Sequence, residues 1–254
     1  MKRSSDILYG IHPVREALRA GRRRLRTLYL GERYADRRLA PLKALAAAHG
    51  IPVKTIPAAD LRKLAGTDMH QGVCLEAGAL PLMEITALIS RIGKEDKAPF
   101  LLLLDGVVDP NNLGALVRTA LCAGVDGVVI PRDRSAAPTP AADRASAGAM
   151  EHIRLTRVTN MVTTIQQLKT RGLWVVCADR HASQTLFATD LTGPLGLVIG
   201  GEEKGLRPLV KKTCDQLTAI PQSGAVDSLN ASAAGAVLMY EALRQRSRKE
   251  RSTQ

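Results

Sequence analysis

The pattern of apolar and polar residues divides the chain into short apolar runs and longer stretches with helical spacing. From Leu39 to Ala48 the apolar residues recur every three or four positions, and Gly50 follows where a left-handed cap ends a helix. The runs at 100–104 and 195–199 are almost entirely apolar, which is typical of strands covered on both faces. The alternation of the two kinds of segment predicts an α/β fold with a parallel sheet.

A polar stretch separates two series of such segments. Residues 1–78 predict a small N-terminal α/β domain with strands at 25–30, 52–56 and 72–77. Residues 79–98, which include the charged GKEDK run, predict a linker. The pattern of residues 99–247 predicts the second domain, with strands at 100–104, 127–131, 173–178, 195–199 and 216–220. Residues 248–254 are expected to form a charged tail. Helices are expected at 14–19, 39–48, 59–64, 113–123, 141–150, 161–171, 206–212 and 231–246.

The net charge of the chain indicates that its binding partner is a polyanion. The 254 residues include 36 Lys and Arg against 24 Asp and Glu, a net charge of +12. Of these, 18 basic and 10 acidic residues precede Ala98, so +8 of the excess lies in the smaller N-terminal part. Two basic clusters in one small domain favour nucleic-acid phosphates over an ordinary solvated surface. The clusters are Arg22, Arg23, Arg24 and Arg26, and Arg33, Arg37, Arg38 and Lys43.

Other features narrow the class of protein. No apolar run approaches the roughly 20 residues of a membrane span, and the first residues lack the apolar core of a signal peptide, so a cytoplasmic protein is predicted. The four cysteines, Cys74, Cys122, Cys177 and Cys214, form no CxxC pair and fall in apolar patterns. They are expected to be buried reduced thiols and neither zinc ligands nor disulfides.

Three polar loops follow apolar strands and precede helices, where open α/β sheets bind ligands. They are DGVVDPNNLG at 105–114, GGEEKG at 200–205 and IPQSGAVDSLNASAAGA at 220–236. None matches the glycine pattern of a dinucleotide site or a phosphate-binding loop. His152 and His181 have no metal-ligand spacing, and no Ser/His/Asp set lies on one domain face, so hydrolase and metalloenzyme chemistry find no support.

Two of these loops carry the side chains with the clearest chemical potential. Arg118 lies in an otherwise apolar helix, where a guanidinium needs a partner, and Glu202 is the predicted one. The alternative is that Asn112 only caps this helix and that Arg118 is solvated. Ser228 and Asn230 could likewise be helix caps. However, a helix cap needs only one or two such residues, and this loop has ten residues rich in Gly, Ser, Asp and Asn, which indicates that it binds a ligand.

Two further features allow a structural or a functional interpretation. His70 and Gln71, just before the last strand of the N-terminal domain, are candidate RNA contacts, although a histidine in such a place is more often structural. The small-residue face of Ala231, Ala234, Gly235 and Leu238 permits close helix packing between two subunits or inside one.

The three loops resemble the motifs of the SPOUT superfamily, and specifically the SpoU or TrmH-type RNA ribose 2′-O-methyltransferases. DPNNLGALVRTA at 109–120 is similar to the first motif, LVIGGEEKGL at 197–206 to the second and IPQSGAVDSLNASAA at 220–234 to the third. YGIHPVREAL at Tyr9 and MHQGV at Met69 resemble the small RNA-binding domain that precedes the catalytic domain in members acting on a guanosine of large-subunit ribosomal RNA. The resemblance covers nearly the whole chain.

The resemblance implies more than the residue patterns show. It implies a deep trefoil knot in the C-terminal domain, a homodimer and S-adenosylmethionine as methyl donor, with RNA and not DNA as partner and no metal. The backbone of Gly200, Ile220 and Leu229 would hold the adenosine part of the donor. The catalytic and RNA-facing set would be Asn112, Arg118, Glu202, Ser228 and Asn230, with Arg118 as proton acceptor or as an orienting group.

Three functions therefore stay open. The first is 2′-O-methylation of a 23S ribosomal RNA guanosine, which the accessory domain at 1–78 favours. The second is the same reaction on a transfer RNA. The third is a non-catalytic RNA-binding role in ribosome assembly, which five intact site residues disfavour.

Overall fold

The chain folds into two compact units, and one of them is discontinuous in sequence. A computed structural model describes residues 5–32, 38–94, 97–202, 205–224 and 228–253. The first unit comprises residues 1–81 and 138–152, and the second comprises 82–137 and 153–254. The segment 138–152, expected inside the second domain, is thus part of the first unit, and residues 82–92 of the expected linker are part of the second.

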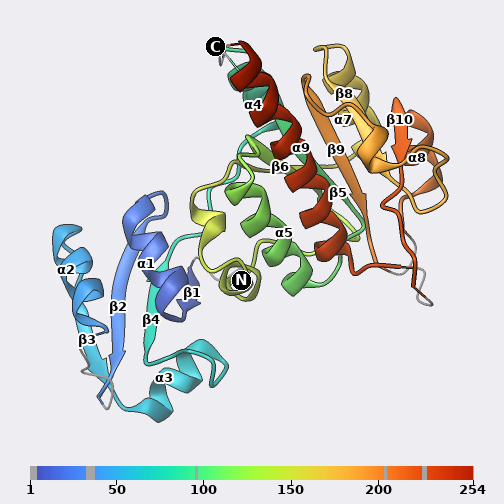
Figure 1. Cartoon of the computed structure of the whole chain (residues 1–254). Helices are drawn as coiled ribbons and strands as arrows, with labels where there is room; N and C mark the ends of the chain where they lie inside the picture. The colour runs from blue at the N-terminus through green and yellow to red at the C-terminus, as the bar shows by residue number, and fades with distance from the viewer. Residues whose placement is uncertain (1–4, 33–37, 95–96, 203–204, 225–227, 254) are drawn as a thin grey trace. The chain divides into compact units, whose positions relative to one another are not determined.

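A four-stranded mixed sheet forms the centre of the first unit (Figure 1). The strand order is β1-β4-β2-β3, and only β2 and β3 pair in parallel. Leucines of the sheet pack against α1 and α2 in one apolar cluster. The elements are β1 (Asp6–Tyr9), α1 (Ile11–Ala20), β2 (Leu25–Gly31), α2 (Ala40–Ala48), β3 (Val53–Ile56), α3 (Ala58–Ala65), β4 (Val73–Ala77), α6 (Pro140–Ala145) and the 3₁₀ helix η2 (Ala149–Glu151).

A buried ion pair holds the segment 138–152 within this unit. The guanidinium of Arg23 donates from Nε to Glu151 at 2.7 Å and from Nη1 to Asp6 at 2.8 Å. The side chains of Arg23 and Glu151 are both fully buried. At Gly148, with φ of 87°, a Cβ would lie 2.6 Å from Cβ of Glu16, so only glycine allows this approach.

A fully parallel six-stranded sheet forms the second unit, as the apolar strands predicted. Its order is β10-β8-β9-β5-β6-β7, so β5 and β9 are central. The elements are α4 (Ile85–Ile92), β5 (Phe100–Asp105), α5 (Pro110–Cys122), β6 (Gly127–Pro131), β7 (Leu155–Val158), α7 (Met161–Lys169), β8 (Trp174–Ala178), η3 (Leu186–Ala188), β9 (Leu195–Gly200), α8 (Pro208–Thr213), β10 (Gln216–Thr218) and α9 (Ala231–Thr253).

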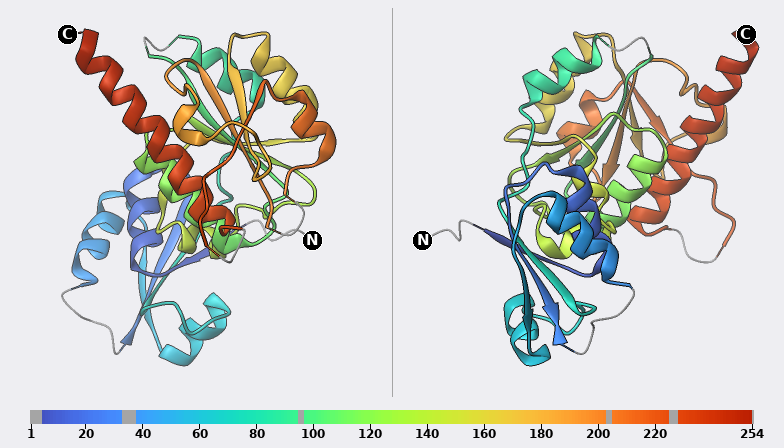
Figure 2. Two further views of the ribbon diagram at one scale, coloured as in Figure 1. Left: turned by 45° about the vertical axis from the view of Figure 1, so that its right-hand side comes forward. Right: turned by 90° about the vertical axis from the view of Figure 1, so that its left-hand side faces the viewer.

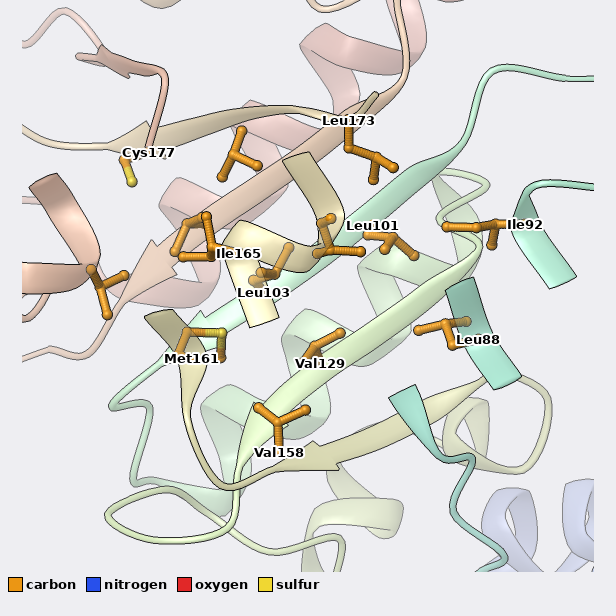
Figure 3. Packing of buried hydrophobic residues seen from close by; sticks show 14 residues of the cluster. Leu88, Ile92, Leu101, Leu103, Val129, Val158, Met161, Ile165, Leu173 and Cys177 are labelled. Carbon is orange, nitrogen blue, oxygen red and sulfur yellow. The ribbon is translucent and has the colours of Figure 1, made fainter. Parts of the chain in front are cut away.

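Helices cover both faces of this sheet (Figure 2). On one face, side chains of α4, α7 and α8 close over strand residues such as Leu101, Leu103 and Val129 in one buried cluster (Figure 3). On the other face α5 and α9 lie side by side, and Gly235 of α9 sits so close to Leu116 that a Cβ would lie 2.3 Å from its Cδ2. The small-residue face of α9 therefore serves packing inside this chain.

Several short elements differ from the sequence prediction. Strands β1 and β7 were not predicted, because four residues give too little alternation to separate a strand from a loop. The helix expected at 141–150 is in fact α6 followed by a turn and η2, since Ala147 and Gly148 both have positive φ.

The expectation of four buried reduced cysteines is wrong in two respects. Cys177 at the end of β8 and Cys214 after α8 form a disulfide, which the wide sequence spacing concealed. Cys122 is exposed, while Cys74 is buried, and burial raises the pKa of its thiol to about 12. Within the described residues, no helix combines the length and apolar character needed to cross a membrane.

Candidate functional site

A pocket of about 770 Å³ lies in the second unit, at the edge where its parallel strands end. Ala178 at the end of β8, Gly200 at the end of β9 and Thr218 at the end of β10 all line it. The carboxyl ends of parallel strands meet at one edge, so loops far apart in the sequence converge there. The volume is in the range of sites for small organic ligands and cofactors.

The loop after β9 reaches the pocket through unusually close backbone contacts. A Cβ on Gly200 would lie 2.4 Å from the carbonyl carbon of Gly205, and one on Gly201 would lie 2.0 Å from the carbonyl oxygen of Gly106. The amide of Gly201 also donates to the carbonyl oxygen of Asp105 at 2.9 Å. Glycine is therefore required where the second polar loop crosses the first, as the pattern GGEEKG indicated.

A buried carboxylate fixes the same two loops. Asp105, fully buried at the end of β5, accepts the backbone N–H of Arg207 at 3.0 Å and its Nε at 2.8 Å. These charge-assisted bonds tie the strand end to the start of α8. Glu203 and Lys204, between these anchors, lie outside the described residues.

The predicted partnership of Arg118 with Glu202 is not what the structure shows. Glu202 accepts a hydrogen bond from Nδ2 of the buried Asn112 at 2.5 Å. Arg118 is exposed on α5 and makes no hydrogen bond or ion pair with any described residue. Asn112 does not cap α5 either, because the cap is Asp109, whose side chain accepts from the backbone of Asn111.

The third polar segment contributes both pocket wall and helix cap. Ile220, Ser228 and Leu229 line the pocket, and Leu229 is 44% exposed. Asn230 is not among the residues that line the pocket. Its Oδ1 accepts the backbone N–H of Ser232 at 2.8 Å and the Ser232 hydroxyl at 2.6 Å, as the side chain of a helix cap does. Residues 225–227 lie outside the described residues.

Four ionisable pocket residues were not among the sequence candidates. Asp179, Arg180 and His181 follow β8, and Lys211 belongs to α8. The signal was present, because the sequence ADRH follows the apolar strand WVVC just as the other polar loops follow theirs. A search for metal-ligand spacing does not detect His181, because that criterion ignores its position directly after a strand. No group of side chains suited to a metal ion occurs in the described part of the chain.

In the first unit the structure changes the candidate RNA contacts. Arg23 is buried in its ion pairs and cannot face a phosphate, and Arg22 donates to backbone oxygens of Glu151 and Pro81. His70 is 6% exposed, and its Nδ1 accepts the backbone N–H of Gly72. Gln71 is exposed, yet its side-chain oxygen accepts the backbone N–H of Ile11.

Other basic residues of this unit remain accessible. Arg24, Arg38 and Lys43 are exposed, whereas Arg33 and Arg37 lie outside the described residues. The basic surface is therefore real, but it consists of fewer of the predicted side chains than the sequence suggested. A run of arginines does not reveal which members turn inward.

Comparison with known proteins covers both units. Residues 99–240 match the SpoU rRNA Methylase family, and residues 7–83 match the family described as RNA 2'-O ribose methyltransferase substrate binding. The 23S rRNA (guanosine-2'-O-)-methyltransferase RlmB of Ralstonia nicotianae is 42% identical over 246 residues, covering 96% of this chain and 97% of the relative.

Solved structures show the same fold. The AdoMet-bound rRNA methyltransferase from Sinorhizobium meliloti superposes with a TM-score of 0.79 at 26% identity, covering 95% of this chain and 87% of that one. The SpoU methyltransferase AviRb from Streptomyces viridochromogenes has a TM-score of 0.81 at 24% identity and covers 97% of this chain and 91% of its own.

Proposed function

This chain belongs to the SpoU rRNA methylase family, and we propose that it transfers a methyl group from S-adenosylmethionine to the ribose 2′-oxygen of a guanosine in 23S ribosomal RNA. The observation that carries the proposal is the pocket at the carboxyl edge of the parallel sheet. The second and third polar loops line it, and Asn112 of the first is bonded to Glu202 at its rim. Relatives with this activity match nearly the whole chain, first unit included.

The residues present fit a nucleoside methyl donor. Ile199, Leu206, Ile220 and Leu229 give the pocket an apolar surface for a purine, and the glycines of the second loop leave backbone groups accessible. When bound, the donor supplies a methyl group on a positively charged sulfonium. We assign the backbone of Gly200, Ile220 and Leu229 to its adenosine part.

The protein's task is then to place the acceptor ribose and to manage one proton. As the 2′-oxygen bonds to the methyl carbon, the carbon–sulfur bond breaks and the hydroxyl loses its proton. Positioning alone can supply several kcal/mol of the barrier reduction. Ser228, at the pocket wall, is assigned to hydrogen-bond the hydroxyl or a neighbouring phosphate.

Arg118 and Glu202 have separate roles in this proposal. Because Arg118 is exposed and unpaired within the described residues, its guanidinium is available to incoming RNA, where it orients the acceptor or accepts its proton. Because an arginine side chain is a very weak acid and keeps its proton, the orienting role is the simpler one. Glu202 holds Asn112, and Asn230 fixes the start of α9, so both shape the site through their neighbours.

The first unit is proposed to hold the ribosomal RNA. The exposed Arg24, Arg38 and Lys43 supply charge that binds phosphates without reading sequence. Gln71 stays a candidate contact, because it is exposed, while the inward-facing Arg23 and His70 no longer are. Such an enzyme acts where ribosomal RNA is made, so a cytoplasmic location is proposed with it.

We also propose a homodimer and a trefoil knot, as the family resemblance implies. Exposed apolar side chains on α5 and α9 support the dimer: Leu121, Val237 and Tyr240 are 36%, 38% and 50% exposed. Val237 and Tyr240 are three residues apart and share one helix face. Analytical ultracentrifugation tests the dimer directly.

Transfer of labelled methyl groups tests the function. The purified protein and labelled S-adenosylmethionine are incubated with ribosomal RNA from cells lacking the protein, and the modified position is mapped. We expect one 2′-O-methylguanosine in 23S RNA. Label found only in transfer RNA would replace the substrate, and no detectable donor binding at millimolar concentration would favour a non-catalytic RNA-binding protein.

Substitution of Arg118 tests its role. Arg118→Ala should lower the methyl-transfer rate about 100-fold or more and leave the thermal unfolding midpoint unchanged, because the exposed side chain makes no hydrogen bond or ion pair with any described residue. Arg91→Ala, at an exposed position of α4, is the matched control and should retain full activity. Near-normal turnover by Arg118→Ala would remove the residue from the mechanism.

A further inference from the structure

The pocket lining consists of two chemically different groups of residues. The apolar group comes from β9, the segment after β10 and the start of α9, and it includes Ile199, Ile220 and Leu229. The second group, which we call the charged cluster, comprises Asp179, Arg180 and His181 after β8 and Lys211 on α8. Methyl transfer as described above uses none of these four side chains.

Contacts among its members organise the charged cluster. Lys211 Nζ lies 2.6 Å from Oδ2 of Asp179, and Oδ1 of Asp179 accepts the backbone N–H of His181 at 2.9 Å. Nε of Arg180 donates to Nε2 of His181 at 3.0 Å, which holds the guanidinium beside the imidazole. The carboxylate of Asp179 thus holds both the loop and the lysine in place.

Asp179 is ionised at neutral pH. Partial burial would raise the pKa of its carboxyl, but the hydrogen bonds from Lys211 and from the backbone of His181 outweigh this effect and hold the pKa below its usual range. The cluster therefore presents two cations and one anion to the pocket, all within one short loop and one helix face.

We infer that the charged cluster binds the zwitterionic amino-acid end of the methyl donor, with Lys211 and Arg180 facing its carboxylate and Asp179 facing its ammonium group. The inference rests on the proposed function and deepens it, because that proposal assigns residues only to the adenosine part. A carboxylate and an ammonium that leave water for a pocket need partners of opposite charge, and the cluster supplies both signs.

The combination of positive and negative side chains in the charged cluster also distinguishes a site for an amino-acid group from a site for a simple anion. A free phosphate would gain from the two cations but would meet the Asp179 carboxylate, whereas an α-amino acid matches both. Adenosine, which has no charge, gains nothing from either. The cluster should therefore select ligands that carry the complete amino-acid end.

Binding of two ligands by calorimetry tests the inference. The ligands are S-adenosylmethionine and methylthioadenosine, which keeps the adenosine and loses the amino-acid end, and the proteins are the unchanged chain, Lys211→Gln, Arg180→Gln and the control Lys212→Gln. Lys212 is the exposed neighbour of Lys211 and does not line the pocket. Lys211→Gln and Arg180→Gln should each weaken S-adenosylmethionine binding about ten- to a hundredfold.

The affinity for methylthioadenosine should be the same in all four proteins, which also shows that the variants are folded. An equal loss for both ligands would place the cluster at the adenosine part and overturn the assignment. Unchanged binding of S-adenosylmethionine by both variants would overturn it as well. Failure of the unchanged chain to bind S-adenosylmethionine would instead refute the proposed function, so the two failures are distinguishable.

Discussion

At the scale of single residues, the site depends on positions where a side chain would not fit. Gly201 packs its backbone on Gly106, and Gly200 packs on Gly205, so three stretches of backbone meet without intervening side chains. Asp105 and Glu202 then hold these loops by hydrogen bonds to Arg207 and Asn112. The shape of the pocket therefore follows from backbone contact, and single carboxylates secure it.

Adding one methyl group at Gly201 should disturb the pocket. Gly201→Ala places a Cβ 2.0 Å from the carbonyl oxygen of Gly106, and backbone cannot move aside as a flexible side chain can. We expect a loss of stability of about 1 to 3 kcal/mol and weaker methyl-donor binding. Urea unfolding and calorimetry measure the two effects.

Gly193→Ala is the control for this change. A Cβ at Gly193 meets no atom within 4 Å, so stability and binding should both be retained. Equal behaviour of the two alanine variants would show that the loops adapt, and that the close approach is not required.

Sequence alone predicted which loops meet but not how their side chains pair. The motifs placed Gly200, Ile220, Ser228 and Leu229 at the edge of the sheet, because each directly follows or precedes a regular element. The pairing of Arg118 with Glu202 failed because six residues turn a helix through about 600°, which leaves Asn112 and Arg118 on different faces. Which face meets the second loop depends on the packing of α5.

At the scale of elements, helix α9 is anchored along its second half. Arg246 donates to the carbonyl oxygens of Ala98, Pro99 and Gly193, and its guanidinium lies 4.8 Å from the centre of the Phe100 ring. Gln245 bonds both Thr189 and Leu191. The helix is thus tied to the start of β5 and to the segment before β9, while its first turn borders the pocket.

Removing the arginine should loosen this anchor. Arg246→Ala leaves several carbonyl oxygens without their charged donor, and we expect it to destabilise the protein by about 2 to 4 kcal/mol. Arg244→Ala removes an exposed guanidinium that pairs with the largely buried Glu241 on the same helix, and it should cost clearly less than Arg246→Ala. Similar losses in urea unfolding would contradict the anchoring role.

The elements themselves could be predicted where periodicity was long. Strands β5 and β9 and helix α5 have strong apolar patterns, and the structure contains them close to the predicted positions. The error at 141–150 has a physical cause, because Ala147 adopts a positive φ that alanine rarely takes and that no pattern indicates.

At the scale of the whole molecule, the discontinuous first unit was beyond prediction from local patterns. The segment 138–152 reads as a helix following a strand, and only the buried partners of Glu151 reveal where it belongs. Asp143 lies in the same interior with Glu151 and Arg23 as charged neighbours. Glu151 and the more exposed Asp6 pair directly with the guanidinium of Arg23, and Asp143 is close enough to be influenced by its charge.

This arrangement should make stability depend on pH. Burial and the neighbouring Glu151 raise the pKa of Asp143 from 3.8 to about 7, although Arg23 opposes the shift. Between about pH 4 and pH 7 the unfolded chain releases a proton that the folded unit keeps, so stability falls as pH rises and the loss is complete above pH 7. The fall should not exceed about 1.4 kcal/mol per pH unit.

Asp143→Asn, which cannot ionise, tests the origin of this dependence. Its stability relative to the unchanged chain should increase from pH 5 to pH 8 in urea unfolding measured at each pH. Asp68→Asn, at an exposed position, should show no such trend. A constant difference across the range would assign the pH dependence to other groups.

The discontinuous first unit also has a consequence for biosynthesis. The chain emerges from the ribosome from its N-terminus, and Glu151, which pairs with Arg23, appears about seventy residues after β4. Until then the buried arginine has only Asp6 as a described acidic partner. The first unit is therefore completed only while the second unit is already being made, and a shortened protein ending at residue 81 would lack a piece of its own interior.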